Sequence, residues 1–237
     1  MIIKHIPYMD YLEAIRQRHS VRRYLSQPLC KELADGLLEE IDKCNKEGHL
    51  HIQLVANEPK AFRGINSYGK FSGVENYIVM AGEKAADLDF RIGYYGERLV
   101  LAAQTFGLNT CWVGLTYRKV PSGYVLGENE KVVCVIAVGY GEENGSRHKH
   151  KTREMVSNAG EATPQWFSDG VDAALLAPTA VNQQKFYFEY MPARDGGKPR
   201  VKAKRLFSLL GYTKIDLGIA CCHFEIGAGK ENFEWDR

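Results

Sequence analysis

The chain of 237 residues carries 31 lysine and arginine residues against 29 aspartate and glutamate residues, a formal net charge of +2. This length suits one large domain or two small ones, and either buries enough apolar surface to fold without disulfides. The balance of charge lacks the global basic excess of nucleic-acid binders and of proteins that bind anionic membranes. Any preference for anions must therefore be local.

Six cysteines are scattered along the sequence without paired spacing, and two of them, Cys221 and Cys222, are adjacent. This pattern predicts reduced thiols rather than a disulfide framework. The apolar run within residues 1–7 is too short for a signal peptide, and no segment approaches the roughly 20 apolar residues of a membrane span. We therefore expect a cytoplasmic protein with no membrane partner.

Two helices are predicted at the start of the chain. Apolar residues at helical spacing indicate a helix over 8–18 and a second one that follows Ser26-Gln27-Pro28, where a capping residue and a proline come together. The second helix carries a stripe of leucines and ends near 45–48. Residues 49–75 contain a strand-like stretch at 51–55 and are otherwise expected to cross the surface, with glycines at Gly64, Gly69 and Gly73.

A buried strand is the clearest prediction of the middle region. The run 131–140 is uninterrupted and β-branched, which is typical of a central strand covered on both faces. Before it come a strand over 77–81, a long helix over 87–106 that stops at Gly107, and a turn or short strand over 108–115. After it, the basic run 147–153 is either a solvated loop or a contact for phosphate at the end of the central strand.

The residues that follow a polar linker at 157–164 are predicted to form a second segment. It contains a predicted helix over 166–176, an alternating strand over 185–190, and a stretch at 201–210 whose pattern leaves strand and helix open. An apolar helix over 215–228 has small residues at positions suited to close packing. The polar tail to Arg237 is expected to be frayed.

The stretch 18–24 concentrates cationic side chains. Arg18, Arg22 and Arg23 lie within seven residues of one another, together with the hydroxyl of Ser20, on what we expect to be a turn after the first helix. Guanidinium forks match phosphate or a delocalised oxyanion, and a hydroxyl adds a further donor. The alternative is that these arginines simply complement the negative end of the helix dipole in water.

Several motifs together resemble the flavin-dependent nitroreductase family. The family's first helix ends in Arg-x-Ser-x-Arg, which stands here at residues 18–22, and its Ala-Pro-Ser-x-x-Asn-x-Gln motif corresponds to Ala-Pro-Thr-Ala-Val-Asn-Gln-Gln at 177–184. The helix and its exit, 97–114, look like the family's long helix and Gly-Leu-Gly-Thr-Cys-Trp sequence. The strand into Gly139-Tyr140 and the basic run complete the likeness.

The order of these motifs resembles the single-chain TM nitroreductase branch. In most members the Ala-Pro-Ser motif precedes the long helix, whereas here it follows residue 176. The resemblance implies an α+β, nitroreductase-like fold with a mostly antiparallel central sheet flanked by helices and a pseudo-dimeric internal duplication. Residues 1–156 would be the first half and 157–237 the second, together forming one FMN site in a chain for which a monomer is plausible.

The resemblance assigns the phosphate and ring-edge contacts of the flavin to the first motif. Arg18 and Ser20 would hold the phosphate, and Arg22 would stabilise negative charge at the pyrimidine edge of the reduced ring. A further set from the basic run would close on the phosphate: Arg147, Lys149 and Lys151.

The flavin ring would be bounded by two other segments. The turn that includes Trp112 would bring the backbone of Val113 and Gly114 beside flavin N5, which exchanges hydride. The second half would pack and hydrogen-bond against the far side of the flavin through Pro178, Thr179, Asn182 and Gln184. Lys185 replaces the family's usual proline after the glutamine.

The expected function is an FMN-dependent oxidoreductase that passes electrons from NAD(P)H to a small electron-poor acceptor such as a nitroaromatic or a quinone. The alternative is an FMN-binding or sensing protein without turnover. A specialised reaction such as dehalogenation or flavin breakdown would need a lid, for which 57–75 is the candidate. We expect no nucleic-acid partner and no metal, because the spacings of His148 with His150 and of Cys221-Cys222-His223 do not suit a closed zinc site.

Overall fold

The computed structural model describes residues 9–63, 70–194 and 196–236, which divide into two compact units. The first unit comprises 1–88 and 98–147, and the second comprises 89–97 and 148–237. The predictions for residues 1–7, Gly64, Gly69, Arg237 and part of the proposed lid lie outside the described residues. The description below treats each unit by itself.

The first unit contains a four-stranded antiparallel sheet with the strand order β1-β2-β4-β3. Its strands are β1 (Gln53–Val55), β2 (Asn76–Glu83), β3 (Asn109–Val113) and β4 (Glu130–Gly139). β4 pairs with both β2 and β3, and its last six residues are buried. The prediction of a central strand over 131–140 is therefore confirmed, and β3 is left with a free edge.

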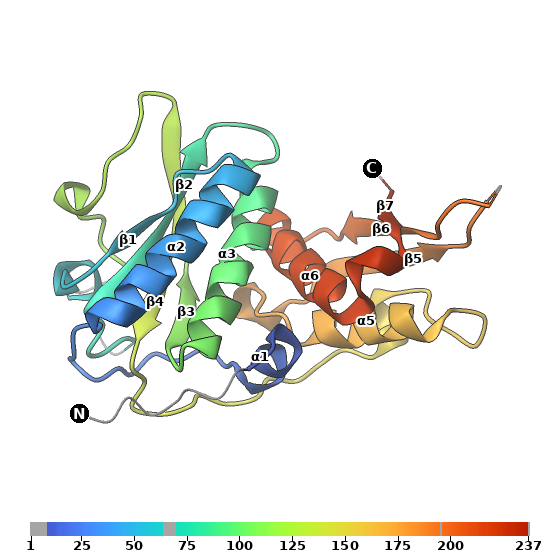
Figure 1. Cartoon of the computed structure of the whole chain (residues 1–237), viewed down its shortest axis with the longest axis horizontal. Helices are drawn as coiled ribbons and strands as arrows, with labels where there is room; N and C mark the ends of the chain where they lie inside the picture. The colour runs from blue at the N-terminus through green and yellow to red at the C-terminus, as the bar shows by residue number, and fades with distance from the viewer. Residues whose placement is uncertain (1–8, 64–69, 195, 237) are drawn as a thin grey trace. The chain divides into compact units, whose positions relative to one another are not determined.

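Helix α2 (Lys31–Gly48) lies across one face of this sheet (Figure 1). Leu37, Ile41 and Cys44 form its buried stripe, whereas Leu38 is 48% exposed. The helix follows Pro28, as predicted, and Cys30, with extended backbone, is its N-cap. Proline disfavours helical backbone in the residue before it, which keeps this stretch extended.

The other helices of the first half match their sequence patterns. α1 (Tyr11–Gln17) begins where the Asp10 carboxylate accepts a hydrogen bond from the Glu13 amide, 2.7 Å away. α3 (Leu88–Thr105) ends at Gly107, whose φ of +76° is the left-handed conformation that favours glycine at helix ends. Short 3₁₀ turns occur at Pro59–Phe62 and Pro121–Gly123.

The second unit packs helices against a smaller sheet. Its helices are α4 (Arg153–Val156), α5 (Gln165–Leu175) and α6 (Thr213–Ala228), with 3₁₀ turns at Ala180–Asn182 and Lys230–Asn232. β5 (Phe186–Met191) pairs antiparallel with β6 (Arg200–Arg205), which pairs parallel with β7 (Glu234–Trp235). Within the described ranges, every helix falls short of the length and apolar character needed to cross a membrane.

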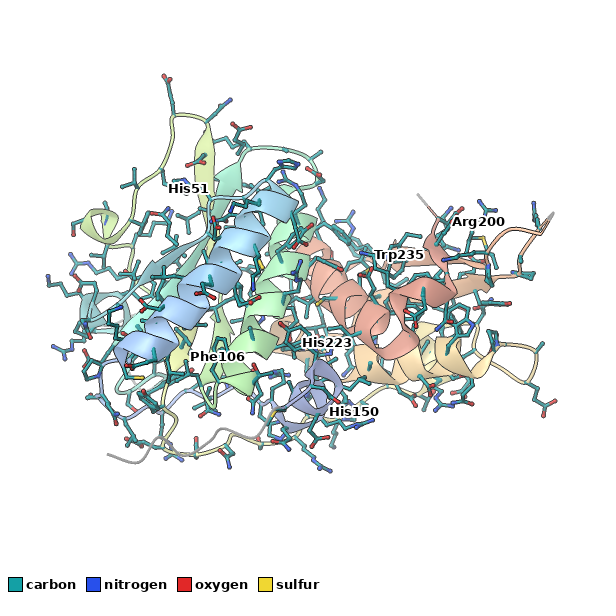
Figure 2. The ribbon with its side chains drawn as sticks, in the orientation of Figure 1. His51, Phe106, His150, Arg200, His223 and Trp235 are labelled. Atoms are coloured by element: carbon teal, nitrogen blue, oxygen red, sulfur yellow. The ribbon has the colours of Figure 1, made fainter. Side chains whose placement is uncertain are left out.

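The polar tail is packed, contrary to the prediction that it frays. Trp235 on β7, labelled in Figure 2, lies 5.6 Å from the ring of Phe224. Phe233 stacks on Trp166 with ring centroids 5.6 Å apart. The Asp236 carboxylate also accepts a hydrogen bond from Arg200, 2.7 Å away. The buried ring of Phe233 and the partly buried ring of Trp235 contribute enough apolar contact to outweigh the polar composition around them.

The predicted linker at 157–164 begins as part of the second unit. Ser157 is buried and bridges to Phe188 of β5, and Asn158 exchanges two hydrogen bonds with the backbone of Tyr190. The two units divide at 147/148 instead. That the chain consists of two half-repeats, 1–156 and 157–237, stays a prediction.

Small residues bring α6 close to the first turns of α3, as its composition predicts. A Cβ at Gly218 would lie 2.1 Å from the carbonyl oxygen of Phe90, and one at Gly93 would lie 2.1 Å from that of Ile215. These contacts leave no room for a methyl group, because backbone on both sides would have to move.

We expect Gly218→Ala to lower the free energy of unfolding by about 2 kcal/mol, the typical cost of overpacking a close contact. Gly36→Ala on α2 is the matched control, since a Cβ there would meet only the ring of Phe106 at 3.4 Å and alanine favours helix. Thermal unfolding followed by circular dichroism compares the two. Equal melting temperatures for both variants would contradict the close packing.

Candidate functional site

The Arg18–Tyr24 stretch is extended backbone laid along the free edge of β3, not the turn that was predicted. The Val21 amide donates to the Thr110 carbonyl at 3.0 Å, and Ser20 bridges to the same residue. On the other side, the Ser72 amide donates to the Arg22 carbonyl at 3.0 Å, and the Tyr24 amide donates to the Ser72 carbonyl at 2.9 Å. Pairing on both sides fixes the directions of the side chains.

Arg18, Ser20 and Arg22 all influence the buried thiol of Cys111, although Arg22 itself is exposed. Burial raises the pKa of the Cys111 thiol, and the charges of Arg22 and Arg18 and a hydrogen bond from Ser20 oppose that rise. Residues two apart on an extended chain point to the same side. The structure therefore brings the three motif residues together, as the sequence prediction required, with Arg18 only 5% exposed.

Arg23 does not join this cluster. Its guanidinium makes a two-pronged pair with the Glu143 carboxylate at the surface, and this pair raises the pKa of Arg23. Of the three arginines predicted to bind an anion, Arg23 is therefore paired with Glu143 instead.

Arg147 lies on the same side of the first unit as Arg18. Burial lowers the pKa of His19, and the charges of Arg18 and Arg147 lower it further. The loop that carries Arg147 passes close to the extended stretch at Gly145, where φ is +70° and a Cβ would lie 2.9 Å from the Ser20 carbonyl oxygen. The first unit therefore concentrates positive charge around Arg18, Arg22 and Arg147.

The predicted flavin-facing turn begins later than expected. Cys111, Trp112 and Val113 are the last residues of β3, and the bend starts at Gly114. Cys111 and Val113 are buried, whereas Trp112 is partly exposed on the opposite face of the strand. The approach of the Val113 and Gly114 backbone to flavin N5 stays a prediction.

In the second unit, the motif 177–184 forms a strained turn. Val181, Asn182 and Gln184 have φ values of +46°, +56° and +44°. This conformation is rare for residues with a side chain and is a genuine outlier for a β-branched one, and Val181 is 78% exposed. Such a turn persists only where its surroundings hold it.

Gln184 joins this turn to the basic run. Its buried side-chain amide accepts a hydrogen bond from the Lys151 amide at 2.9 Å and donates one to the Lys149 carbonyl at 2.8 Å. Asn182 donates to the same carbonyl at 2.8 Å, and the Thr179 hydroxyl accepts from the Gln184 amide at 3.0 Å. These side chains and partly buried Pro178 were predicted to face flavin, and that contact stays a prediction. In the structure, the hydrogen bonds of Gln184 and Asn182 hold the basic run in place.

The ammonium group of Lys151 is drawn toward the same turn. It donates to the Gln184 carbonyl at 2.6 Å, and its pKa is lowered by burial and by the neighbouring charge of Lys185. The lysine that replaces the family's proline thus adds to a local positive charge in the second unit.

Sequence reasoning missed Asp216, which supports the turn from α6. Its carboxylate is 2% exposed and accepts hydrogen bonds from the Ala180 amide at 2.9 Å and from the Gln183 side chain at 2.6 Å. Burial raises the pKa of Asp216 to about 6, against the opposing effect of these two donors. A carboxylate inside an otherwise apolar helix was the available signal, because buried charges require dedicated partners.

The residues considered as metal ligands are engaged differently. His148 and His150 both contact the Leu175 carbonyl, at 3.4 and 2.9 Å (Figure 2). Cys221 and Cys222 are buried in the core of the second unit, as expected. Across the described ranges, no three His, Cys, Asp or Glu side chains are grouped in a way that could hold a metal ion.

Comparisons with known proteins support the fold independently. The chain matches, over residues 10–228, the model of the family described as "Putative TM nitroreductase". No match was found among curated proteins.

Two solved structures are similar. A "putative nitroreductase" from Thermotoga maritima is 24% identical, with a TM-score of 0.66 over 97% of this chain and 88% of that one. A "putative nitroreductase in complex with fmn" from Desulfovibrio desulfuricans is 20% identical, with a TM-score of 0.52 over 66% of this chain and 99% of that one. The nitroreductase-like α+β fold expected from the motifs is confirmed, and the chain belongs to the TM nitroreductase family.

Proposed function

We propose that the chain is an FMN-dependent oxidoreductase that transfers hydride from NADH or NADPH to a small electron-poor acceptor such as a nitroaromatic or a quinone. The observation that carries the proposal is the convergence of Arg18, Ser20 and Arg22 around Cys111, next to Arg147. Membership of a nitroreductase family and the FMN named for one structural relative support it.

The residues present fit the proposed cofactor. FMN carries a phosphate dianion and becomes anionic in the ring when reduced, and the first unit offers three guanidinium groups and a hydroxyl to meet such charge. Arg18 and Ser20 would hold the phosphate with Arg147, and Arg22 would hold charge at the pyrimidine edge. In the second unit, Lys149 and Lys151 would add to the phosphate contacts.

When bound, FMN supplies the hydride acceptor and donor at N5. The protein's part is to bind and orient it, because a fixed cation near the reduced ring favours reduction without reorganisation. The Val113–Gly114 backbone would lie beside N5, and the turn containing Pro178 and Thr179 would bound the ring. We further propose one FMN per chain, which flavin-to-protein stoichiometry measures.

The visible absorption spectrum of the purified protein tests the proposal. We expect a bound-flavin spectrum that bleaches on anaerobic addition of NADH or NADPH and returns when a quinone or nitroaromatic is added. A flavin that binds but is not reduced would favour the FMN-binding or sensing alternative. A protein that stays colourless after incubation with FMN would contradict the proposal.

A further inference from the structure

We propose that Asp216 is a positioning residue that holds the basic run Lys149–Lys151 in place through the strained turn at 178–184. The proposal rests on the proposed function for the ligand, an FMN phosphate, but the positioning itself follows from contacts within the second unit. No motif pointed to Asp216, and it lies in the first helical turn of α6, away from the basic run in sequence.

The first link joins Asp216 to the turn. One carboxylate oxygen accepts from the Ala180 amide and the other from the Gln183 side chain, which also donates to the Gly211 carbonyl at 3.2 Å. Val181 and Asn182, between these two anchored residues, and Gln184, directly after them, have positive φ. Because positive φ is unfavourable for residues with a side chain, the turn depends on its anchors to keep this shape.

The second link joins the turn to the basic run. Gln184 holds the Lys151 amide, the Lys149 carbonyl and, through its own carbonyl, the Lys151 ammonium group. Asn182 supports Gln184 with a hydrogen bond at 2.6 Å and also reaches the Lys149 carbonyl. Asp216 is therefore connected to the two lysines by two sets of hydrogen bonds joined through the backbone of the turn, an arrangement called the relay below.

Protonation of Asp216 would weaken the first link, because both of its partners donate and a protonated carboxyl has fewer acceptor sites for them. Burial raises the pKa of Asp216 to about 6, so this change falls between about pH 7 and pH 5. The folded state holds the proton more tightly than the unfolded chain, so the charge of Asp216 lowers stability as the pH rises from the ordinary pKa of 3.8 to about 6. A buried charge that opposes folding but supports a site is consistent with a functional role.

Hydrogen exchange and FMN binding test the proposal with two variants. Asp216→Asn removes one acceptor from the relay, and Asp42→Asn is its control, because Asp42 pairs with Lys46 at the exposed surface of α2. We expect Asp216→Asn to speed exchange of the 147–153 peptide at least ~10-fold while the 186–191 peptide is unchanged, the size expected from losing one hydrogen bond to a charged group. FMN affinity, from quenching of flavin fluorescence at pH 8, should fall by a similar factor.

The pH profile separates positioning from general destabilisation. FMN affinity of the wild-type chain should weaken more than that of Asp216→Asn between pH 8 and pH 5.5, although the phosphate titrates equally in both. Lys151 and Lys185 are the charged groups at the far end of the relay, and the wild-type chain and Asp216→Asn both retain them.

The outcomes test the relay and the proposal of FMN binding separately. Faster exchange in Asp216→Asn, with FMN bound by neither chain, would support the relay and overturn the FMN proposal. Wild-type exchange and affinity in Asp216→Asn would overturn the relay. If Asp216→Asn does not fold, Gln183→Leu removes the hydrogen bond from the partly exposed Gln183 side chain to Asp216. The same exchange measurement is then made on this variant.

Discussion

Replacing Arg18 with glutamine should weaken FMN binding at least ~30-fold, because removing one partner of a buried charge pair costs about 2–5 kcal/mol. Arg18 ends α1 with extended backbone and is almost fully buried, so its guanidinium is held at the Cys111 cluster. Arg18→Lys keeps the charge but loses the planar fork, and we expect an intermediate loss of about 10-fold. Titration of the apoprotein with FMN, followed by fluorescence quenching, measures both.

Arg16 provides the matched control, since it lies on the same helix, exposed, and pairs with Glu13 at 3.5 Å. Arg16→Gln should leave the dissociation constant within about twofold, because exposed charges contribute little. Equal losses at Arg16 and Arg18 would mean that only the general positive potential matters. An unchanged affinity in Arg18→Gln, with the melting temperature preserved, would exclude Arg18 from the phosphate site.

Elements with a strong periodic or continuous apolar pattern could be predicted from the sequence. β4, α3 and α6 carry such patterns because most of their side chains are buried. β6 could not be assigned, since Arg200–Arg205 alternates charged residues around one buried side chain, Val201. The tail was misjudged for the same reason: Phe233 and Trp235 pack against aromatic partners distant in sequence, and a local polar composition does not reveal them.

The candidate site could be predicted to the level of its motifs but not of its supporting contacts. The spacing of Arg18, Ser20 and Arg22 is two residues, which brings them together only on extended backbone, and that conformation comes from pairing with Thr110 and Ser72. Likewise, the turn at 178–184 was recognised, whereas its dependence on Asp216 was not. Such contacts join residues more than 30 positions apart, so no local pattern encodes them.

A buried pair in the second unit should dominate its stability. His223 on α6 and Glu97 on α3 are both fully buried, and His223 Nε2 lies 2.8 Å from Glu97 Oε1 (Figure 2). The other ring nitrogen, Nδ1, lies 3.0 Å from the Ala173 carbonyl, which only accepts, so Nδ1 carries a proton. One more proton is therefore shared between Nε2 and the carboxyl group, and each group satisfies the other where water does not reach.

We expect Glu97→Leu or His223→Leu to lower the free energy of unfolding by about 3–5 kcal/mol, because each breaks a buried pair by removing one of its partners. The double variant should regain most of this loss, since apolar groups replace both partners and the Ala173 carbonyl still accepts from the Leu176 amide. Glu189→Gln, at the half-exposed pair with Lys204, is the surface control and should cost less than about 1 kcal/mol. Urea unfolding curves give the four values, and single variants no less stable than this control would contradict the role of the buried pair.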